Sequence, residues 1–197
     1  MCHIPDDHKV FDGTDFKSSV LDPLPRFGAR VVLRHLRPVD LPAFQAYRSN
    51  EAVGRFQGWS AQTDQQALEL LEEMSDVVLF PSGSWVQLGI ADRETNGLIG
   101  DIGACVAIDG KSAELGFTVS SRFQGQGLGT EAVSEAMELL FEQRLVAKVV
   151  CITDARNNPS VRLLERVGMR RLVTAEAVFR GEPCIEHTYA VVWRDGG

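Results

Sequence analysis

The feature that most constrains this 197-residue chain is a cluster of glycines that joins a strand-like segment to a helix-like one. The segment is FTVSSRFQGQGLGTEA, and its glycines are Gly125, Gly127 and Gly129. Glycine has no Cβ, so the backbone there can approach a ligand closely and can adopt positive φ angles. The exposed N–H groups and the dipole at the start of the following helix favour an anion such as a pyrophosphate. The sequence therefore predicts an anion site at this turn; the alternative is that the glycines only permit a tight turn.

The usual phosphate-binding motifs do not fit this loop. It lacks the Gly-Lys-Ser/Thr ending of a P-loop, and G-Q-G-L-G-T lacks the last glycine of a dinucleotide-binding fingerprint. The loop also follows a predicted antiparallel meander, whereas a dinucleotide fingerprint opens a βαβ unit. Nucleotide binding is therefore an alternative that the motif itself does not favour.

The hydrophobic pattern predicts strands and helices that together make a mixed α/β domain. Strands are expected over 30–36, 84–92, 98–108, 112–120, 148–153, 169–179 and 184–193. Helices are expected over 41–50, from 63, over 127–144 and from 158 to 168. Three consecutive strands form the meander that runs into the glycine loop, and the elements after the loop alternate between helix and strand.

Cap and turn residues indicate where several of these elements begin. Asp40 and Asn158 are expected N-caps, and Thr63 begins a T-x-x-Q capping box. The segment RETNG separates two of the predicted strands, and its pair Asn96-Gly97 predicts a hairpin, because both residues can take positive φ. Gly168 is expected to end its helix in the left-handed conformation.

Composition indicates one ordinary globular domain preceded by an arm. The chain is 44% hydrophobic and 24% charged, which excludes collagen-like and disordered chains. Residues 1–28 show little periodicity, so we expect an arm there and a single domain over 29–197. No apolar run approaches the roughly 20 residues that cross a bilayer, and the start has no secretory signal. We therefore expect a soluble, cytoplasmic protein without a membrane partner.

Charge and cysteine usage exclude further classes of partner. The net charge is −7, which argues against nucleic-acid binding because phosphate contacts need a surplus of Lys and Arg, and which suits a cationic acceptor. The four cysteines form no CxxC pair, so we expect reduced thiols and no metal site. Cys105, Cys151 and Cys184 lie in predicted strands and are expected to be buried. A metal site in the polar arm is the alternative, with the candidate ligands Cys2, His3, Asp6, Asp7 and His8.

Around the glycine loop the chain resembles the GNAT family of N-acetyltransferases. The family signature Q/R-x-x-G-x-G/A is met by Gln124-x-x-Gly127-x-Gly129. The element order from about 31 to 193 is similar to the family fold, and Asn157-x-x-Ser160 before LLERVGM is similar to the RimJ/RimL subgroup of ribosomal-protein N-terminal acetyltransferases. The resemblance implies a mostly antiparallel central sheet that is flanked by helices and split in a V between its fourth and fifth strands.

The resemblance also implies that the chain binds acetyl-coenzyme A. The pyrophosphate would lie on backbone N–H groups of the loop, and the pantetheine would lie along the split like an extra strand. Asn157 would reach the cofactor arm, or would only lead into the helix. The predicted cofactor-binding residues are Phe117, Val119, Gln124, Gly125, Gln126, Gly127, Gly129, Thr130 and Asn157.

Two side chains are candidates for the chemistry of acetyl transfer. The amine must lose a proton, and the departing thiolate must be stabilised. Glu114 could take the proton, with Asp101 in reserve, although a carboxylate at the start of a strand is more often only solvated. Many family members place a Tyr as thiolate acid where this chain has Leu164. Ser160 is then the nearest hydroxyl, unless it only forms the first helical turn.

The acceptor side is predicted from the loop between the first two helices, where the resemblance places it. Phe56 and Trp59 are expected to line it; the alternative is that they are packing anchors. The predicted reaction moves an acetyl group from acetyl-coenzyme A to a primary amine of a protein N-terminus or a small molecule, by direct attack in a ternary complex. The alternatives are an aminoglycoside-modifying acetyltransferase and a coenzyme A-binding module without catalysis. The resemblance also implies a homodimer.

Overall fold

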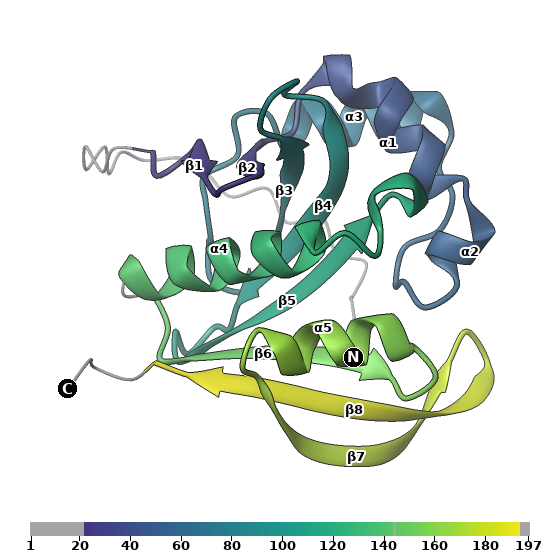
Figure 1. Ribbon diagram of the computed structural model, residues 1–197, viewed down its shortest axis with the longest axis vertical. Helices are drawn as coiled ribbons and strands as arrows, with labels where there is room; N and C mark the ends of the chain where they lie inside the picture. Colours follow the sequence, from purple (N-terminus) through teal and green to yellow (C-terminus); the bar gives the residue numbers. More distant parts are fainter. Residues whose placement is uncertain (1–21, 144, 194–197) are drawn as a thin grey trace.

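The computed structural model describes residues 22–143 and 145–193 and shows a mixed α/β protein (Figure 1). The strands are β1 Arg26–Phe27, β2 Val31–His35, β3 Trp85–Asp92, β4 Leu98–Val106, β5 Ser112–Val119, β6 Lys148–Asp154, β7 Arg170–Phe179 and β8 Glu182–Val192. The helices are α1 Leu41–Arg48, α2 Glu51–Gly54, α3 Asp64–Glu73, α4 Leu128–Glu142 and α5 Asn158–Arg166, with short 3-10 turns at Pro38–Asp40 and Ser121–Phe123. Most of the predicted arm and the alternative metal site at Cys2 to His8 lie outside the described residues.

The eight strands form one sheet in the order β1-β2-β3-β4-β5-β6-β8-β7. Every neighbouring pair is antiparallel except β5 and β6, which are parallel and paired only from Ser112–Glu114 to Lys148–Val150. Beyond these residues the two strands diverge, which confirms the predicted V-shaped split. The split lies between the fifth and sixth strands, because the two-residue β1 pairs with β2 and precedes the strands that the sequence predicts.

The helices cover opposite faces of the first half of the sheet. Val119 of β5 faces α4, since a Cβ added at Gly129 would lie 3.2 Å from its Cγ2 atom. The preceding Thr118 faces the other side, where its hydroxyl accepts a hydrogen bond from Trp59 in the segment between α2 and α3. Successive side chains of a strand alternate between faces, so these two contacts define the two layers. Figure 1 shows α4 lying across the strands, with α5 beside β6 and β8.

Both faces of the sheet contribute to one hydrophobic core. Leu88, Ile90 and Ile102 of the sheet and Leu140 of α4 are all fully buried, as is Tyr47 of α1. Full burial of a side chain of this size stabilises the fold by about 1.5–3 kcal/mol. The core therefore holds the glycine loop, which lies between β5 and α4, on two well-packed elements.

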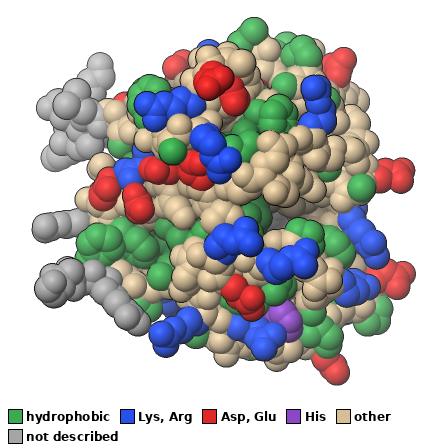
Figure 2. All heavy atoms as spheres, in the orientation of Figure 1, with side chains coloured by type: hydrophobic (Ala, Val, Ile, Leu, Met, Phe, Trp, Pro, Cys, Tyr) green, Lys and Arg blue, Asp and Glu red, His purple; other side chains and the backbone are tan. Residues whose placement is uncertain are grey.

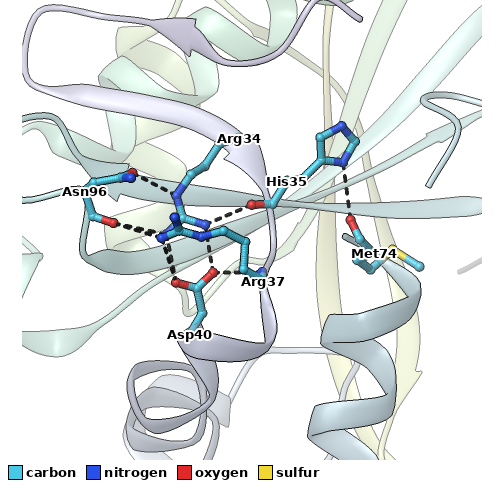
Figure 3. A network of polar contacts seen from close by, with 6 residues as sticks. All are labelled: Arg34, His35, Arg37, Asp40, Met74 and Asn96. Atoms are coloured by element: carbon cyan, nitrogen blue, oxygen red, sulfur yellow. Dashed lines mark hydrogen bonds and ion pairs between the residues drawn. The ribbon is translucent and has the colours of Figure 1, made fainter. Parts of the chain in front are cut away.

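The start of α1 differs from the prediction in one respect. Asp40 occupies the N-cap position, but its side chain makes no capping bond. Its carboxylate instead accepts hydrogen bonds from the guanidinium of Arg34 at 2.7 and 2.8 Å and from the N–H of Arg37 at 2.9 Å (Figure 3). Burial raises the pKa of Asp40, but the two arginines outweigh burial and hold that pKa below its usual value. Asp40 therefore forms a buried ion pair with Arg34 instead of the expected N-cap hydrogen bond.

Three other local predictions can be compared with the structure. The Thr63 capping box is confirmed, and Gly168 has the expected positive φ of 84°. Asn158 is wrong as the cap of α5: the preceding Asn157 accepts the hydrogen bond from the N–H of Ser160 at 3.3 Å.

The hairpin predicted across RETNG is confirmed: β3 ends at Asp92, β4 begins at Leu98, and the two strands pair antiparallel. Asn96 has the expected positive φ, 56°, whereas Gly97 is not among the residues with positive φ. The carboxylate of Asp92 accepts hydrogen bonds from both the N–H and the hydroxyl of Thr95, at 2.8 and 2.7 Å, and so stabilises this connection. The same connection lets Asn96 accept a hydrogen bond from Arg34 (Figure 3).

Candidate active site

A cleft of about 450 Å³ opens where the pairing of β5 and β6 ends. Its walls come from α2, β5, the glycine loop, β6 and α5. Figure 2 shows a hollow between the start of α4 and α5, with Lys and Arg side chains over α5 at its edge. The predicted site residues that line this cleft are Phe56, Phe117, Val119, Gln124, Gly125, Gly127, Gly129, Thr130, Asn157 and Ser160.

The glycines of the loop have separate roles. Gly125 and Gly127 have φ angles of 73° and 82°, which side chains rarely tolerate, and Gly127 is the N-cap of α4. A Cβ at Gly129 would lie 3.1 Å from Leu163 of α5 and 3.2 Å from Val119 of β5. The first two glycines therefore shape the loop, and the third lets α4 pack closely on its neighbours. The first N–H groups of α4 have no partner inside the helix and face the region where an anion is expected.

An arginine outside the loop holds it in place. Arg30, which precedes β2, donates a hydrogen bond from its guanidinium to the carbonyl of Gln126 at 3.0 Å. It also donates to the carboxylate of Glu131 in the first turn of α4, which accepts the N–H groups of Arg30 and Val31 as well. Burial raises the pKa of Glu131, but these hydrogen bonds and the charge of Arg30 outweigh burial and hold that pKa below its usual value. Gln126, which was predicted to bind the cofactor, does not line the cleft; its side chain donates to the carbonyl of Arg122.

Two backbone carbonyls of the split already accept amide groups. The side-chain amide of Gln57 donates to the carbonyl of Phe117 at 3.1 Å. The side-chain amide of Gln124 donates to the carbonyl of Val119 at 2.8 Å. The sequence predicts contacts with pantetheine at these two residues. Their carbonyls are therefore placed to accept hydrogen bonds from amide N–H groups in the split.

The α5 side of the cleft contains both expected and unexpected residues. Ser160 lines the cleft in the first turn of α5, and Asn157 lines it while capping that helix. Leu164, which replaces the tyrosine of many family members, is fully buried in the core. Arg162 and Arg166 are exposed and line the cleft, although sequence reasoning missed them. Their spacing of four residues on a helix that begins at the asparagine box is the signal that could have found them.

The two carboxylates proposed as bases lie outside the cleft. Glu114 lies on the part of β5 that is still paired with β6, and it is half-buried. Burial raises its pKa, and the nearby Glu186 raises it further. Asp101 is buried in an ion pair with Arg48 at 3.0 Å and accepts the hydroxyl of Tyr47 at 2.5 Å. Asp101 is therefore wrong as the reserve base, because its carboxylate is held by two buried partners.

The cysteines are buried, as predicted for strand positions. Cys105, Cys151 and Cys184 are all buried thiols outside any disulfide, and Cys2 lies outside the described residues. Cys151 lines the cleft, and burial raises the pKa of its thiol to about 12. A thiol with that pKa is protonated at neutral pH, so it is a weak nucleophile.

Trp59 lies beside a second cavity of about 540 Å³ on the α1 and α3 side of the sheet. Its indole N–H donates to the hydroxyl of Thr118, which lines the cleft, at 3.3 Å. The guanidinium of Arg48 lies 4.4 Å from the centre of the Trp59 ring. Arg180, at the turn between β7 and β8, donates to the carbonyls of Trp59 at 2.6 Å and Gln57 at 3.2 Å. Trp59 thus stands between the two cavities, and the β7–β8 turn holds its backbone.

The described residues contain neither a membrane-spanning helix nor a cluster of metal ligands. None of the helices within 22–143 and 145–193 has the length and apolar character needed to cross a membrane. Over the same residues, no three His, Cys, Asp or Glu side chains gather in a way that could hold a metal ion.

Comparison with known proteins agrees with this arrangement. The family model of the acetyltransferase (GNAT) domain matches residues 30–170. YnaD of Bacillus subtilis, an uncharacterized N-acetyltransferase, is 23% identical over 144 residues, which cover 72% of this chain and 80% of YnaD.

Solved structures share the fold at low sequence identity. RimL, a ribosomal alpha-N-protein acetyltransferase in complex with coenzyme A, gives a TM-score of 0.73 at 15% identity and covers 85% of this chain and 97% of RimL. A chimera of the spermidine N-acetyltransferase SpeG from Vibrio cholerae with hSSAT gives a TM-score of 0.67 at 18% identity, with 83% of this chain and 96% of the chimera covered.

Proposed function

Because this chain belongs to the GNAT acetyltransferase family and is therefore an acetyl-coenzyme A-dependent acetyltransferase, we propose that it acetylates a primary amine by direct attack in a ternary complex. The observation that carries the proposal is the cleft at which β5 and β6 diverge, with the glycine loop and the start of α4 at its edge. This arrangement offers an extended slot for a strand-like ligand and an anion site next to it.

The residues of the cleft fit acetyl-coenzyme A. The free N–H groups at the start of α4 would bind the pyrophosphate, and a Cβ added at Gly125 would meet nothing within 4 Å, so the loop is open to a ligand there. Arg162 and Arg166 of α5 add positive charge for the phosphates. The carbonyls of Phe117 and Val119 accept amide groups in the free protein, so they would accept the amides of pantetheine in the same way.

Acetyl transfer then needs few groups from the protein. The amine nitrogen forms a bond to the thioester carbonyl carbon, the C–S bond breaks, and coenzyme A leaves as a thiolate. Ser160 would donate a hydrogen bond to the sulfur. Glu114 would receive the proton of the amine through water, because it lies below the cleft rather than in its wall.

Direct attack requires no acetylated enzyme. Cys151 is the thiol in the wall of the cleft, and its pKa of about 12 keeps it protonated at neutral pH. An acetyl-cysteine intermediate would need a thiolate at that position, which burial disfavours. The amine itself is the more effective nucleophile once it is deprotonated.

The acceptor is a primary amine of a protein N-terminus or of a small molecule. RimL acts on a ribosomal protein and SpeG on spermidine, so the shared fold accommodates both classes. The net charge of −7 favours the approach of a cationic acceptor of either kind.

Calorimetric titration with acetyl-coenzyme A, with ATP and NAD as controls, tests the cofactor. Thiol release with a panel of amines then tests the transfer. Selective binding of acetyl-coenzyme A followed by amine-dependent thiol release supports the proposal. Selective binding without thiol release from any amine would favour a coenzyme A-binding module, and competition by ATP or NAD would favour a nucleotide site.

A further inference from the structure

The turn between β7 and β8 is fastened to a part of the chain that is far away in the sequence. The turn consists of Arg180 and Gly181, since β7 ends and β8 begins on either side of them. Nη2 of Arg180 donates to the carbonyl of Trp59 at 2.6 Å and to that of Gln57 at 3.2 Å. Both carbonyls belong to the connection between α2 and α3. In Figure 1 the β7–β8 turn and α2 lie at the same end of the molecule.

The backbone of Arg180 is unusual for an arginine. Its φ is 52°, and that of Gly181 is 81°. A two-residue turn with positive φ at both positions is of type I′, in which Asn or Asp before Gly is preferred. A long side chain at positive φ costs conformational energy. The two charge-assisted hydrogen bonds of the guanidinium offset that cost, so they are a reason for an arginine at this position.

The connection that Arg180 holds is itself attached to β5. The side-chain amide of Gln57 donates to the carbonyl of Phe117 at 3.1 Å. The indole of Trp59 donates to the hydroxyl of Thr118 at 3.3 Å. Two neighbouring residues of β5 are thus bound by the same two residues whose carbonyls accept from Arg180. A continuous chain of hydrogen bonds therefore runs from the β7–β8 turn to β5.

This chain of hydrogen bonds crosses the open end of the split. β5 is paired with β6 only as far as Glu114, and β6 is paired with β8. Phe117 and Thr118 lie beyond Glu114, where β5 has left β6, and both line the cleft. The strand pairing joins β5 to β6 and β8 at one end of the split, and Arg180 joins β5 to the β7–β8 hairpin at the other end.

The width of the split matters for a strand-like ligand. Neighbouring strands lie about 4.8 Å apart, so a ligand that lies as an extra strand between β5 and β6 needs their edges about 10 Å apart. Two strands that are joined at one end only can swing at the other end. A second fastening removes this freedom before the ligand binds, which lowers the entropic cost of binding. We propose that Arg180 is this fastening: a positioning residue that holds the split at the width that pantetheine requires.

Arg180 acts through its partners and does not touch the cofactor. Among the described residues, Gln57 and Thr118 line the cleft, whereas Arg180 does not. When an amide of pantetheine takes the carbonyl of Phe117, the contact between Trp59 and Thr118 still keeps the connection on β5. The inference rests on the proposed function, because it concerns how the cofactor of that reaction binds.

Three variants and two ligands test the inference by calorimetric titration. Arg180→Asn removes the guanidinium but suits a type I′ turn, so the hairpin still forms. Arg180→Lys keeps the charge without the two-pronged donor geometry. Arg170→Asn is the matched control, because it removes an exposed arginine from the opposite end of β7. The ligands are acetyl-coenzyme A and 3′-phospho-ADP, which has the phosphates of coenzyme A but no pantetheine.

We expect Arg180→Asn to bind acetyl-coenzyme A about tenfold more weakly than the wild type, because the split is no longer held at the required width. Its affinity for 3′-phospho-ADP should stay within about twofold, since that ligand ends at the glycine loop. Arg180→Lys should lie between Arg180→Asn and the wild type, and Arg170→Asn should change neither affinity. An unchanged melting temperature and retained binding of 3′-phospho-ADP show that Arg180→Asn is folded.

An unchanged affinity of Arg180→Asn for acetyl-coenzyme A would overturn the inference and leave the acetyltransferase proposal standing. Equal weakening of both ligands would also overturn it, because the arginine would then act through general stability or through attraction of the phosphates. A wild-type protein that binds neither ligand would contradict the proposed function itself, and the inference would fall with it.

Discussion

The two cavities on either side of Trp59 are built in different ways. In the cleft, one continuous stretch of chain, from β5 through the glycine loop into α4, presents backbone groups, while α2, β6 and α5 supply the other walls. The second cavity is lined by side chains from four separate segments, among them Arg48, Trp59 and Gln87. A backbone site keeps its chemistry when side chains change, whereas a side-chain site can be altered by single substitutions. The chemistry of the cleft is therefore the harder of the two to change by substitution.

The strongest test of the backbone site is Gly127→Val. A valine at a φ of 82° is strained, and its Cβ would lie 3.2 Å from the guanidinium of Arg30. We expect acetyl-coenzyme A affinity to fall by at least about 100-fold, measured by calorimetry, since the loop no longer presents its N–H groups.

Gly110→Val is the matched control for that variant. Gly110 has a φ of 67° but lies in the turn between β4 and β5, away from the cleft. Gly110→Val should lower the melting temperature through similar backbone strain and leave the affinity for acetyl-coenzyme A unchanged. A Gly127→Val protein that is folded and binds acetyl-coenzyme A normally would exclude the loop as the anion site.

Glu114→Gln tests the predicted base, which lies on β5 just before the residues of that strand that line the cleft. If Glu114 is the base, its raised pKa means that the carboxylate forms, and wild-type kcat rises, at a higher pH than for an ordinary glutamate. The variant should be slower by about 100-fold between that pKa and the pKa of the amine. The two proteins should converge below the first pKa, where Glu114 is protonated. A pH–rate profile with the wild-type shape would remove Glu114 from the mechanism.

The same substitution has a predictable effect on stability. A carboxyl whose pKa is raised by folding lowers the free energy of unfolding as pH rises from its usual pKa to the raised pKa. Above the raised pKa the loss is complete, because the folded state then holds a partly buried charge. Glu114→Gln should therefore raise the melting temperature at pH 8, and the gain should disappear as pH falls below the usual pKa of a glutamate. Equal melting temperatures of the variant and the wild type at pH 8 would contradict the raised pKa.

Arg30→Ala tests whether a side chain holds the backbone site in shape. Loss of Arg30 releases the carbonyl of Gln126 and leaves Glu131 without its cation next to the anion site. We expect acetyl-coenzyme A to bind about tenfold more weakly, with partial recovery in Arg30→Lys.

Arg26→Ala provides the comparison on the same helix. Arg26 forms ion pairs with Glu135, Glu138 and Glu142 of α4 but does not touch the loop. In Figure 2, acidic and basic side chains lie together over α4. Arg26→Ala should lower the melting temperature and leave the affinity for acetyl-coenzyme A unchanged. Equal losses of affinity in both arginine variants would show that Arg30 acts only through general stability.

The smallest expected effect is that of Gln57→Ala. The amide of Gln57 occupies the carbonyl of Phe117, where an amide of the cofactor is expected. Removing it should tighten acetyl-coenzyme A binding by about threefold, since no protein hydrogen bond has to be broken first. Weaker binding in the calorimeter would mean that Gln57 contacts the cofactor instead of competing with it.

The contrast between the cavities also explains what the sequence could predict. The glycine loop, the capping box at Thr63 and most strands follow from local patterns, and the structure has them within a few residues of the predicted limits. Two cap predictions failed because another group makes the hydrogen bond: Arg34 binds the carboxylate of Asp40, and Asn157 caps α5 in place of Asn158. The second cavity could not be predicted, because Gln62 and Gln87 become neighbours only when the sheet has formed.

The short pairing of β5 with β6 has a consequence for the cooperativity of the whole domain. Three residue pairs join the first five strands to the last three, so the sheet consists of two blocks with a narrow connection. A strand-like ligand in the split would bond to both blocks along the length that the strands leave unpaired. We expect amide hydrogen exchange to slow on both edges of the split together when acetyl-coenzyme A binds, and the two blocks to unfold as one unit. The cofactor would then act as a missing strand of the sheet as well as a substrate.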